Sequence, residues 1–439
     1  MKSIAVLGGG ESGVGAALLA KKKGIDVFVS DYGVIAPKYK QELINNNIAF
    51  EEMGHDFERL ENTDIIVKSP GIPDSSEVIQ HFRLRHKEIV SEIELASRFY
   101  EGKVIAITGS NGKTTTTSLI YHLISSSGLN VGLGGNIGHS FARLLSTDEH
   151  FDCVVLELSS FQLDQIISFS AEISIVLNIT PDHLDRYDYD MNKYAQAKWN
   201  LAMHTDPQGC LIINSDDEWT QKMKNQFAVD CEIISYSAND TSQKFFSKEG
   251  NVIEIEKHIN LLGRHNVFNA IVAAKAAQMI GIDTKTILNR LSTFKAIEHR
   301  LESVTILDGI TFVNDSKATN VDSVFVALDS MTAPVIWIAG GVDKGNDYAA
   351  LDDLVKQKVK ALICLTKDDE KLRSAFESMI DSISTTENVD QCIKMALEQA
   401  DEGDVVLLSP ACASFDLFNN YEHRGKAFKE SIKKFEHNN

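Results

Sequence analysis

The sequence predicts an α/β protein built from three domains. At 439 residues the chain is long enough for about three domains of ~150 residues each. Short apolar runs rich in β-branched residues alternate with segments of helical periodicity, a pattern typical of parallel sheets. Polar or glycine-rich turns follow these runs repeatedly, and in open α/β sheets such turns form the edge that binds ligands. We expect the domains to span residues 1–93, 94–298 and 299–439.

The composition narrows the class of protein. A net charge of -19 argues against nucleic acid or an anionic membrane as a general partner. The six cysteines show no C-x-x-C pair and no regular spacing, which is typical of a reducing compartment. The sequence contains neither a signal-peptide pattern nor an apolar run of the ~18 residues that a membrane helix needs. We therefore expect a cytoplasmic protein with no nucleic-acid partner and no membrane insertion.

The strongest pattern lies at residues 104–117, where an apolar strand runs into a glycine turn and a helix. Free backbone N–H groups and the positive end of a helix attract phosphate, and Lys113 adds a point charge. The alternative is an ordinary turn between a strand and a helix. We favour a P-loop-type ATP site with Mg²⁺ in a central domain whose sheet is mostly parallel. Its expected residues are Gly109, Ser110, Asn111, Gly112, Lys113, Thr114 and Thr115.

A second glycine turn follows the strand expected at residues 3–7. Gly8, Gly10 and Gly13 fit the pattern G-x-G-x-x-G, and Asp31 ends the next strand. The pattern predicts a Rossmann-like N-terminal domain. Its turn would bind either NAD or another phosphate-bearing ligand, and the sequence leaves both open. The turn at 69–73, stiffened by two prolines, follows a further strand and would face the same ligand.

The central domain also carries polar side chains just after its strands. Asn136 and Glu157 fall at strand ends, and Glu157 is either solvated or bound to Mg²⁺. His183 lies in a polar loop, where it is either structural or a partner of a cation or nucleotide. Lys198 falls on a helix and is either a solvated charge or, after reaction with CO₂, a carbamate that binds a cation. We expect strands and turns between residues 209 and 251.

Later in the chain, polar clusters again follow strands. Asn266 and Asn269 fall one turn apart at the start of a helix, where they would meet a nucleobase or cap the helix. Asp315 and Lys317 belong to a cluster that exceeds packing needs, and similar clusters occupy residues 340–345 and 409–416. These clusters predict a C-terminal α/β domain, also Rossmann-like, with its own ligand edge. Three such edges predict an enzyme that joins substrates across clefts between domains.

These motifs resemble those of the Mur ligase family over nearly the whole chain. The Asp-Ser-Lys-Ala-Thr-Asn string at 315–320 and the Ser-Pro-Ala-Cys-Ala-Ser-Phe-Asp string at 409–416 are the most selective. The other matching segments are 108–115, 135–138, 156–163, 178–186 and 340–345. Three other classes compete: a related ligase such as folylpolyglutamate synthase, a Rossmann oxidoreductase, and a non-catalytic nucleotide-binding regulator. The second phosphate loop and the candidate magnesium carboxylate disfavour the oxidoreductase.

The resemblance implies ATP-driven amide formation through an acyl phosphate. Its expected substrates are UDP-MurNAc-L-Ala and D-glutamate, and we expect the protein to be a monomer. It also implies two Mg²⁺ sites, one at Thr114 or Thr115 with Glu157, the other at His183 with a carbamylated Lys198. Asn136 and His183 would face the substrate and the transferred phosphoryl group. The remaining implied contacts are Asn266, Arg300, Asp315 and Lys317 for ATP; Thr319, Lys344, Ser414, Phe415 and Phe418 for D-glutamate; and Ser12, Asp31, Ser69 and Gly71 for the uridine diphosphate.

Overall fold

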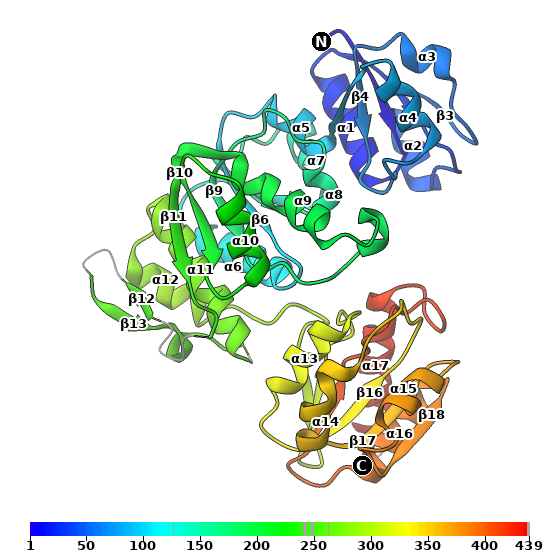
Figure 1. The fold of residues 1–439 in the computed structure, drawn as a ribbon, viewed down its shortest axis with the longest axis vertical. Coiled ribbons are helices and arrows are strands. Elements are labelled where there is room, and N and C mark those ends of the chain that lie inside the picture. The colour runs from blue at the N-terminus through cyan, green and yellow to red at the C-terminus, as the bar shows by residue number, and fades with distance from the viewer. Residues whose placement is uncertain (126, 240–243, 247–249, 262, 437–439) are drawn as a thin grey trace. The chain divides into compact units, whose positions relative to one another are not determined.

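The computed structural model describes residues 1–439 apart from 126, 240–243, 247–249, 262 and 437–439 (Figure 1). The described residues form three larger sheets with flanking helices and one small antiparallel sheet. This architecture confirms the predicted α/β class with N-terminal, central and C-terminal domains. Contacts divide the chain into two compact units, residues 1–258 with 268–292 and residues 259–267 with 293–439.

The N-terminal sheet is parallel and runs in the order β3-β2-β1-β4-β5. Leu7 pairs with both Ser30 and Lys68, so the turns after β1, β2 and β4 begin at the same edge. Its elements are β1 (Ser3–Leu7), α1 (Glu11–Lys22), β2 (Asp26–Ser30), α2 (Pro37–Asn45), β3 (Ala49–Glu51), α3 (Phe57–Glu61), β4 (Ile65–Lys68), α4 (Glu77–Leu84), β5 (Glu88–Ser91) and α5 (Glu92–Ser97).

The central sheet is also parallel and runs in the order β11-β10-β9-β6-β8-β7. Glu157 pairs with Ile107 and Gly135, and Thr108 pairs with Val176, so four strands end together. The strands are β6 (Lys103–Thr108), β7 (Val131–Gly135), β8 (Cys153–Glu157), β9 (Ala171–Val176), β10 (Thr205–Asn214) and β11 (Glu232–Tyr236), and a separate hairpin pairs β12 (Lys244–Phe246) with β13 (Val252–Glu254).

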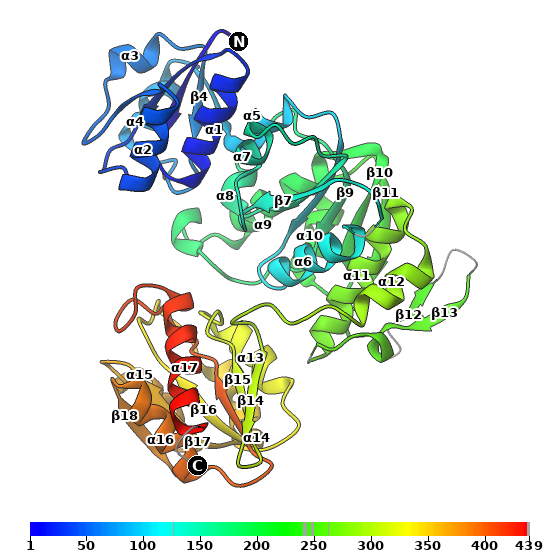
Figure 2. The same ribbon diagram turned by 180° about the vertical axis from the view of Figure 1, so that it is seen from behind.

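Helices lie around this central sheet, and α6 packs against α12 (Figure 2). They are α6 (Lys113–Ile124), α7 (Phe141–Ser146), α8 (Ser160–Leu163), α9 (Met191–Met203), α10 (Glu218–Gln226), α11 (Arg264–Ile280) and α12 (Thr284–Leu291), with 3-10 turns η1 (Leu184–Tyr187) and η2 (Ile255–His258). Helix α10 corrects our expectation of strands and turns alone between 209 and 251. Asp217 starts this helix by accepting a hydrogen bond from the Thr220 N–H, but few apolar side chains mark its period.

The N-terminal and central domains share one hydrophobic core. Buried side chains from both sheets and from α1, α5 and α7 form a single cluster, and α1 packs against both α5 and α7. Helix α5 joins the domains: the Glu94 carboxylate accepts hydrogen bonds from the N–H groups of residues 167–169. Glu92 accepts from the Ala142 N–H, but its other oxygen is buried and has no partner among the described residues. Burial therefore raises the pKa of Glu92 to about 8.

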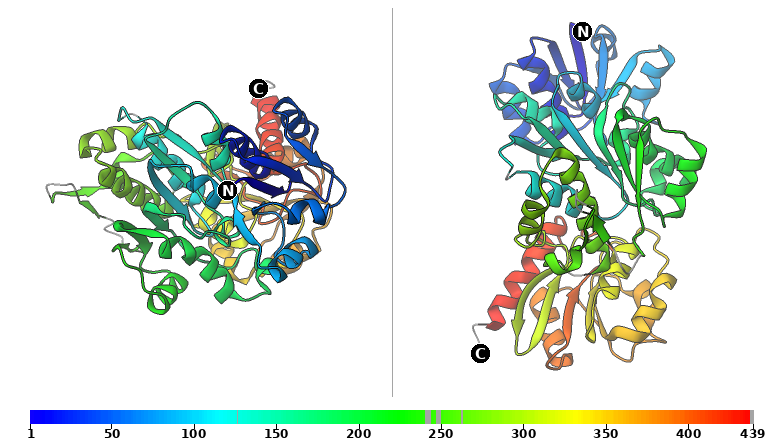
Figure 3. Two further views of the ribbon diagram at one scale, coloured as in Figure 1. Left: turned by 90° about the horizontal axis from the view of Figure 1, so that it is seen from above. Right: turned by 90° about the vertical axis from the view of Figure 1, so that its left-hand side faces the viewer.

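The C-terminal sheet runs in the order β14-β15-β19-β16-β17-β18, and only its first pair is antiparallel. Helix α17, red in Figure 3, packs on β15. Leu408 pairs with Asn314 and Ile338, so three polar turns begin at one edge. The elements are β14 (Glu302–Leu307), β15 (Ile310–Asn314), α13 (Val321–Asp329), β16 (Val335–Ala339), η3 (Ala349–Leu351), α14 (Asp352–Lys358), β17 (Val359–Leu365), α15 (Glu370–Phe376), β18 (Ile383–Thr386), α16 (Val389–Gln399), β19 (Val405–Leu408) and α17 (Tyr421–Glu436).

Within the described residues, no helix combines the length and the apolar character needed to cross a membrane. The expected boundaries at 93/94 and 298/299 stay predictions.

Candidate active site

The glycine turn after β6 forms a tight loop at the start of α6. Gly112 has a φ of +83°, and a Cβ there would lie 2.9 Å from the Asn269 Oδ1 atom. The N–H groups of Ser110 and Asn111 both donate to Oδ1 of Asn178, at 3.0 and 2.8 Å. The Asn178 amide donates in turn to the Asn111 carbonyl at 3.0 Å. Asn178 therefore shapes this loop, a role that its place after β9 could have suggested.

Two lysines meet at this loop. Lys113 donates to the carbonyls of Gly109 and Ser110, at 2.7 and 2.9 Å. Lys198, on α9, is only 2 % exposed and donates to the same Gly109 carbonyl at 2.8 Å. The alternative of a solvated surface charge at Lys198 is therefore wrong, because the helix turns this side chain toward the sheet. Burial, and then the charge of Lys113, holds the pKa of Lys198 well below the usual range for lysine.

Glu157 and Asn136 meet at the neighbouring strand ends. The Asn136 amide donates to Oε1 of Glu157 at 2.8 Å, and the Asn136 N–H donates to the Glu157 carbonyl at 2.8 Å. Glu157 is 1 % exposed, and its Oε2 atom has no hydrogen-bond partner among the described residues. An unpaired buried carboxylate oxygen is costly, and a cation would satisfy it. The site therefore fits a hard divalent cation at Glu157.

The remaining groups of the two predicted Mg²⁺ sites lie nearby in the same unit. Thr114 and Thr115 are buried in the first turn of α6. The charges of Lys113, Asp182 and Glu157 all act on Lys198, so these groups share one electrostatic environment. Among the described residues, no three His, Cys, Asp or Glu side chains gather to hold a metal. The predicted sites would instead combine single carboxylate or imidazole groups with hydroxyl and carbamate oxygens.

His183 occupies a strained position before η1. Its φ is +51°, a left-handed conformation that costs energy for a residue other than glycine. Its side chain is half-exposed and lies 3.6 Å from an Asp182 carboxylate oxygen. The Phe161 ring packs edge-on against the imidazole, with 5.3 Å between ring centroids. Strain of this kind is typical of functional positions, which favours a role beyond packing for His183.

The four residues expected to bind uridine diphosphate line a single pocket of about 740 Å³. They are Ser12, Asp31, Ser69 and Gly71. Asp31 accepts hydrogen bonds from the N–H groups of Gly9 and Gly33, at 2.6 and 2.8 Å, and so holds the glycine turn closed. A Cβ at Gly13 would lie 1.8 Å from the carbonyl oxygen of Gly8, whereas Gly10 has open space around it. Gly13 therefore allows the helix to pack closely on the turn, and Gly10 leaves the pocket open to a ligand.

In the second unit, Asp315 follows β15. Its carboxylate accepts hydrogen bonds from the Ser409 hydroxyl at 2.9 Å and from the Leu301 N–H at 3.1 Å. Burial nevertheless raises the pKa of Asp315 to about 7. Lys317 lies over the Tyr421 ring, 5.2 Å from its centroid.

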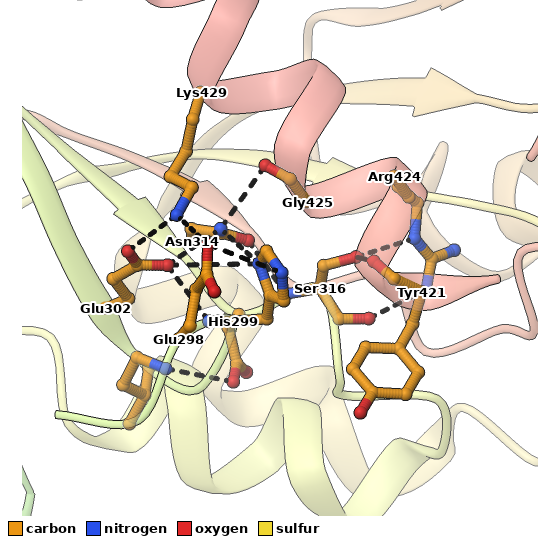
Figure 4. Close-up of polar contacts among 11 residues, drawn as sticks. Glu298, His299, Glu302, Asn314, Ser316, Tyr421, Arg424, Gly425 and Lys429 are labelled. Carbon is orange, nitrogen blue, oxygen red and sulfur yellow. Dashed lines mark hydrogen bonds and ion pairs between the residues drawn. The ribbon is translucent and has the colours of Figure 1, made fainter.

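Figure 4 shows the network that anchors this region. Nδ2 of Asn314 donates to Nδ1 of His299 at 2.9 Å and to the Glu302 carboxylate at 3.0 Å. The His299 N–H and the Lys429 ammonium also donate to Glu302, each at 2.9 Å. A Cβ at Gly425 would lie 2.2 Å from Nδ1 of His299, so α17 can approach only through a glycine. The network fixes the residues beside Arg300 and Asp315. Burial, and then the charge of Arg300, lowers the pKa of His265 to about 4.

The buried side chain of Arg424, which no sequence motif singles out, joins three loops. Its guanidinium donates to the carbonyls of Ser316, Gly340 and Cys412, at 2.9–3.2 Å. It also donates to the Ser316 hydroxyl at 3.0 Å. A lone arginine in a charged helix gives no sequence signal of such a role.

The residues predicted to bind D-glutamate lie on loops that follow three strands. The loops of Lys344 and Ser414 are joined by a bridge between Val342 and Ala413. Ser414 is buried and its carbonyl accepts from the Phe418 N–H at 2.9 Å, whereas Phe415 is 71 % exposed. Thr319 lies between β15 and α13. Asn266 is buried on α11, within the stretch that belongs to the second unit.

Comparisons with known proteins agree with this arrangement. The Mur ligase middle domain matches residues 107–277, the glutamate ligase domain of Mur ligases matches 299–412, and the MurD N-terminal domain matches 3–78. The chain is 45% identical to the UDP-N-acetylmuramoylalanine--D-glutamate ligase of Cytophaga hutchinsonii, covering 98% of each chain. It is 44% identical to the enzyme of the same name from Christiangramia forsetii, covering 98% of this chain and 99% of the relative.

The fold also matches solved structures. The UDP-N-acetylmuramate-alanine ligase MurC of Thermotoga maritima superimposes with a TM-score of 0.61 at 18% identity, covering both chains in full. That likeness concerns the fold alone, whereas the relatives above share almost half of their residues over almost their whole length. The chain therefore belongs to the Mur ligase family.

Proposed function

We propose that the protein joins D-glutamate to UDP-N-acetylmuramoyl-L-alanine in an ATP-dependent amide ligation. The relatives of similar length carry the name of this activity. The observation that carries the chemistry is the meeting of Lys113, Lys198 and Glu157 at the phosphate loop, with a buried lysine of lowered pKa and an unpaired carboxylate oxygen. These groups suit a phosphoryl-transfer site, where positioning and charge stabilisation supply most of the catalysis.

In the proposed reaction, the alanyl carboxylate attacks the γ-phosphate of ATP to form an acyl phosphate and ADP. The amine of D-glutamate then attacks the acyl carbon, and phosphate leaves. Lys113 would neutralise phosphate oxygens, and Asn136 would orient Glu157 through its 2.8 Å hydrogen bond. Bound Mg²⁺ would supply positive charge at the phosphate oxygens, with Thr114 or Thr115 and Glu157 holding one ion and His183 and Lys198 the other.

Lys198 is suited to carry a carbamate because only an uncharged amine reacts with CO₂. Its lowered pKa keeps a larger fraction of this amine uncharged near neutral pH than in an exposed lysine. The resulting carbamate would be an anionic oxygen ligand for a hard cation.

The pocket around Ser12, Asp31, Ser69 and Gly71 would take the uridine diphosphate. Asn266, Arg300, Asp315 and Lys317 would take ATP, and the loops of Thr319, Lys344, Ser414, Phe415 and Phe418 would take D-glutamate.

The test is phosphate release from ATP and Mg²⁺ with UDP-N-acetylmuramoyl-L-alanine and a panel of amino acids. We expect release with D-glutamate but not with L-glutamate. Phosphate release with a different amino acid would support the ligase reaction but identify that amino acid, and not D-glutamate, as the substrate. Binding of ATP with no release of phosphate for any acceptor would contradict the proposal.

The cytoplasmic location and the monomeric state stay predictions that cell fractionation and sedimentation would check.

A further inference from the structure

The turn at 69–73 has two sides with different partners. One side lines the 740 Å³ pocket of the N-terminal domain. On the other side, the carbonyls of Pro70, Gly71 and Ile72 each accept a hydrogen bond from the guanidinium of Arg186, all at 3.3 Å. Arg186 belongs to η1 in the central domain, so a single side chain connects the wall of this pocket to the other domain of the same unit.

The turn that Arg186 holds is stiff within its own domain. The buried Lys68 donates to the Ile72 carbonyl at 3.0 Å and pairs with Asp74 at 2.8 Å. Two prolines restrict the backbone between these contacts. A ligand that fixes the pocket side of this turn would therefore also fix the carbonyls on its far side.

On the central side, Arg186 packs against the residues around His183. Its guanidinium lies over the Phe161 ring, 4.5 Å from the centroid, and its charge acts on the Asp164 carboxyl group. The same ring packs edge-on against His183 and stacks on Tyr187, with centroids 5.9 Å apart. Arginine suits this place because its planar group can donate to several carbonyls while it stacks on a ring.

The segment around Arg186 needs such support. His183, Asp188 and Tyr189 all have left-handed backbone conformations, with φ between +51° and +57°. Such conformations persist in residues other than glycine only where the surroundings determine them. Two side-chain contacts stand out: the Arg186 contact with the turn at 69–73, and the Tyr187 hydroxyl, which donates to the Asp164 carboxylate at 3.1 Å.

We propose that Arg186 is a positioning residue that links occupancy of the N-terminal pocket to the placement of His183. A bound uridine nucleotide fixes the turn at 69–73, the turn fixes Arg186, and Arg186 with Phe161 fixes His183. This proposal rests on the proposed function and deepens it, because it explains how one end of the substrate prepares the site at the other end. Energetic coupling of this kind can be measured as a change in both binding and turnover.

The experiment compares Arg186→Ala and Arg186→Lys with the wild type and with Arg83→Ala. Arg83 is the matched control because it is an arginine on α4, beside the same turn, that pairs with Asp74 and not with the loop carbonyls. Calorimetry measures the Kd for UDP, and steady-state kinetics measure kcat and the KM for each substrate. Since UDP binding needs no turnover, the Arg186 contact can be tested even if the proposed ligase reaction fails.

We expect Arg186→Ala to weaken UDP binding about tenfold and to lower kcat at saturating substrate about tenfold, since it removes charge-assisted bonds to the turn. The KM for ATP should stay within about twofold, and Arg83→Ala should match the wild type. For Arg186→Lys, the Kd for UDP and kcat should lie between those of the wild type and Arg186→Ala. Lysine keeps the positive charge but lacks the planar guanidinium that donates to several carbonyls.

A wild-type kcat in Arg186→Ala, or an equal loss in Arg83→Ala, would overturn the proposal. So would a lower melting temperature with unchanged Kd and kcat, which is the result of a purely structural role. If Arg186→Ala does not fold, Arg186→Lys decides: a weaker UDP affinity together with a lower kcat supports the link, and wild-type values for both overturn it.

Discussion

Lys198 illustrates how burial changes the chemistry of one residue. Replacing Lys198 with alanine should lower kcat at least about a thousandfold, because it would remove the proposed cation ligand at the reacting phosphate. A short-chain carboxylate added to the buffer should restore part of the activity by occupying the space of the carbamate. Lys193→Ala is the control, since Lys193 lies on the same helix but pairs at the surface with Asp188. Near-normal activity of Lys198→Ala under CO₂-depleted conditions would exclude the carbamate.

Glu92 predicts a pH dependence of stability. Its pKa rises from 4.5 to about 8 in the folded protein, so between these values the folded state binds a proton that the unfolded state has released. The free energy of unfolding should therefore fall as pH rises from about 5 to 8, by up to about 3 kcal/mol from this group. Glu92→Gln keeps an acceptor for the Ala142 N–H and should flatten this slope. Denaturant unfolding at several pH values measures the free energy of unfolding of each protein. If this energy changes equally with pH in the wild type and in Glu92→Gln, Glu92 is not the group responsible.

Sequence patterns predicted where the candidate site residues lie along strands and helices better than they predicted what surrounds those residues. The strand-end positions of Asn136 and Glu157 followed from local pattern. The burial of Lys198 did not, because helical periodicity says which side chains share a face but not what lies above that face. Asn178 and Arg424 were missed as contributors because their partners are backbone groups far away in the sequence.

At the scale of elements, the loop between β6 and α6 depends on the end of β9. Asn178→Ala should raise the KM for ATP about tenfold, since two loop N–H groups lose their shared acceptor and the loop loses its shape. Asn192→Ala, which removes an amide that bonds only near the surface of α9, is the control. Steady-state kinetics at varied ATP would check this, and an unchanged KM would show that Asn178 does not shape the loop.

Most strands were predictable because apolar β-branched runs followed by polar turns have few other interpretations. Helix α10 was missed because its start depends on the Asp217 cap and its face is weakly apolar. The shared core of the first two domains was also unpredictable. Local patterns identify each sheet, but the packing of α1 on α7 brings together segments about 130 residues apart in the chain.

For the whole molecule, the proposed function leads us to predict ligand-dependent domain closure. The phosphate loop lies in the first unit, and Arg300, Asp315 and Lys317 lie in the second. If one ATP contacts both sets, the units must meet around it. Small-angle scattering should therefore show a smaller radius of gyration with an ATP analogue and the UDP substrate together. Identical profiles with and without these ligands would count against closure.

The core shared by the first two domains fixes the distance between the N-terminal pocket and the phosphate loop. The pocket beside Gly10 and the phosphate loop at Lys113 belong to one unit, whose domains are joined by continuous apolar packing and by α5. The span between them is therefore set by side-chain volume and not by a flexible linker. In the proposed reaction, a substrate held by its nucleotide in this pocket would have to reach the γ-phosphate of ATP by the length of the substrate itself. If so, the packing between the two domains would set which substrate length fits, although none of these core residues would touch a reacting atom.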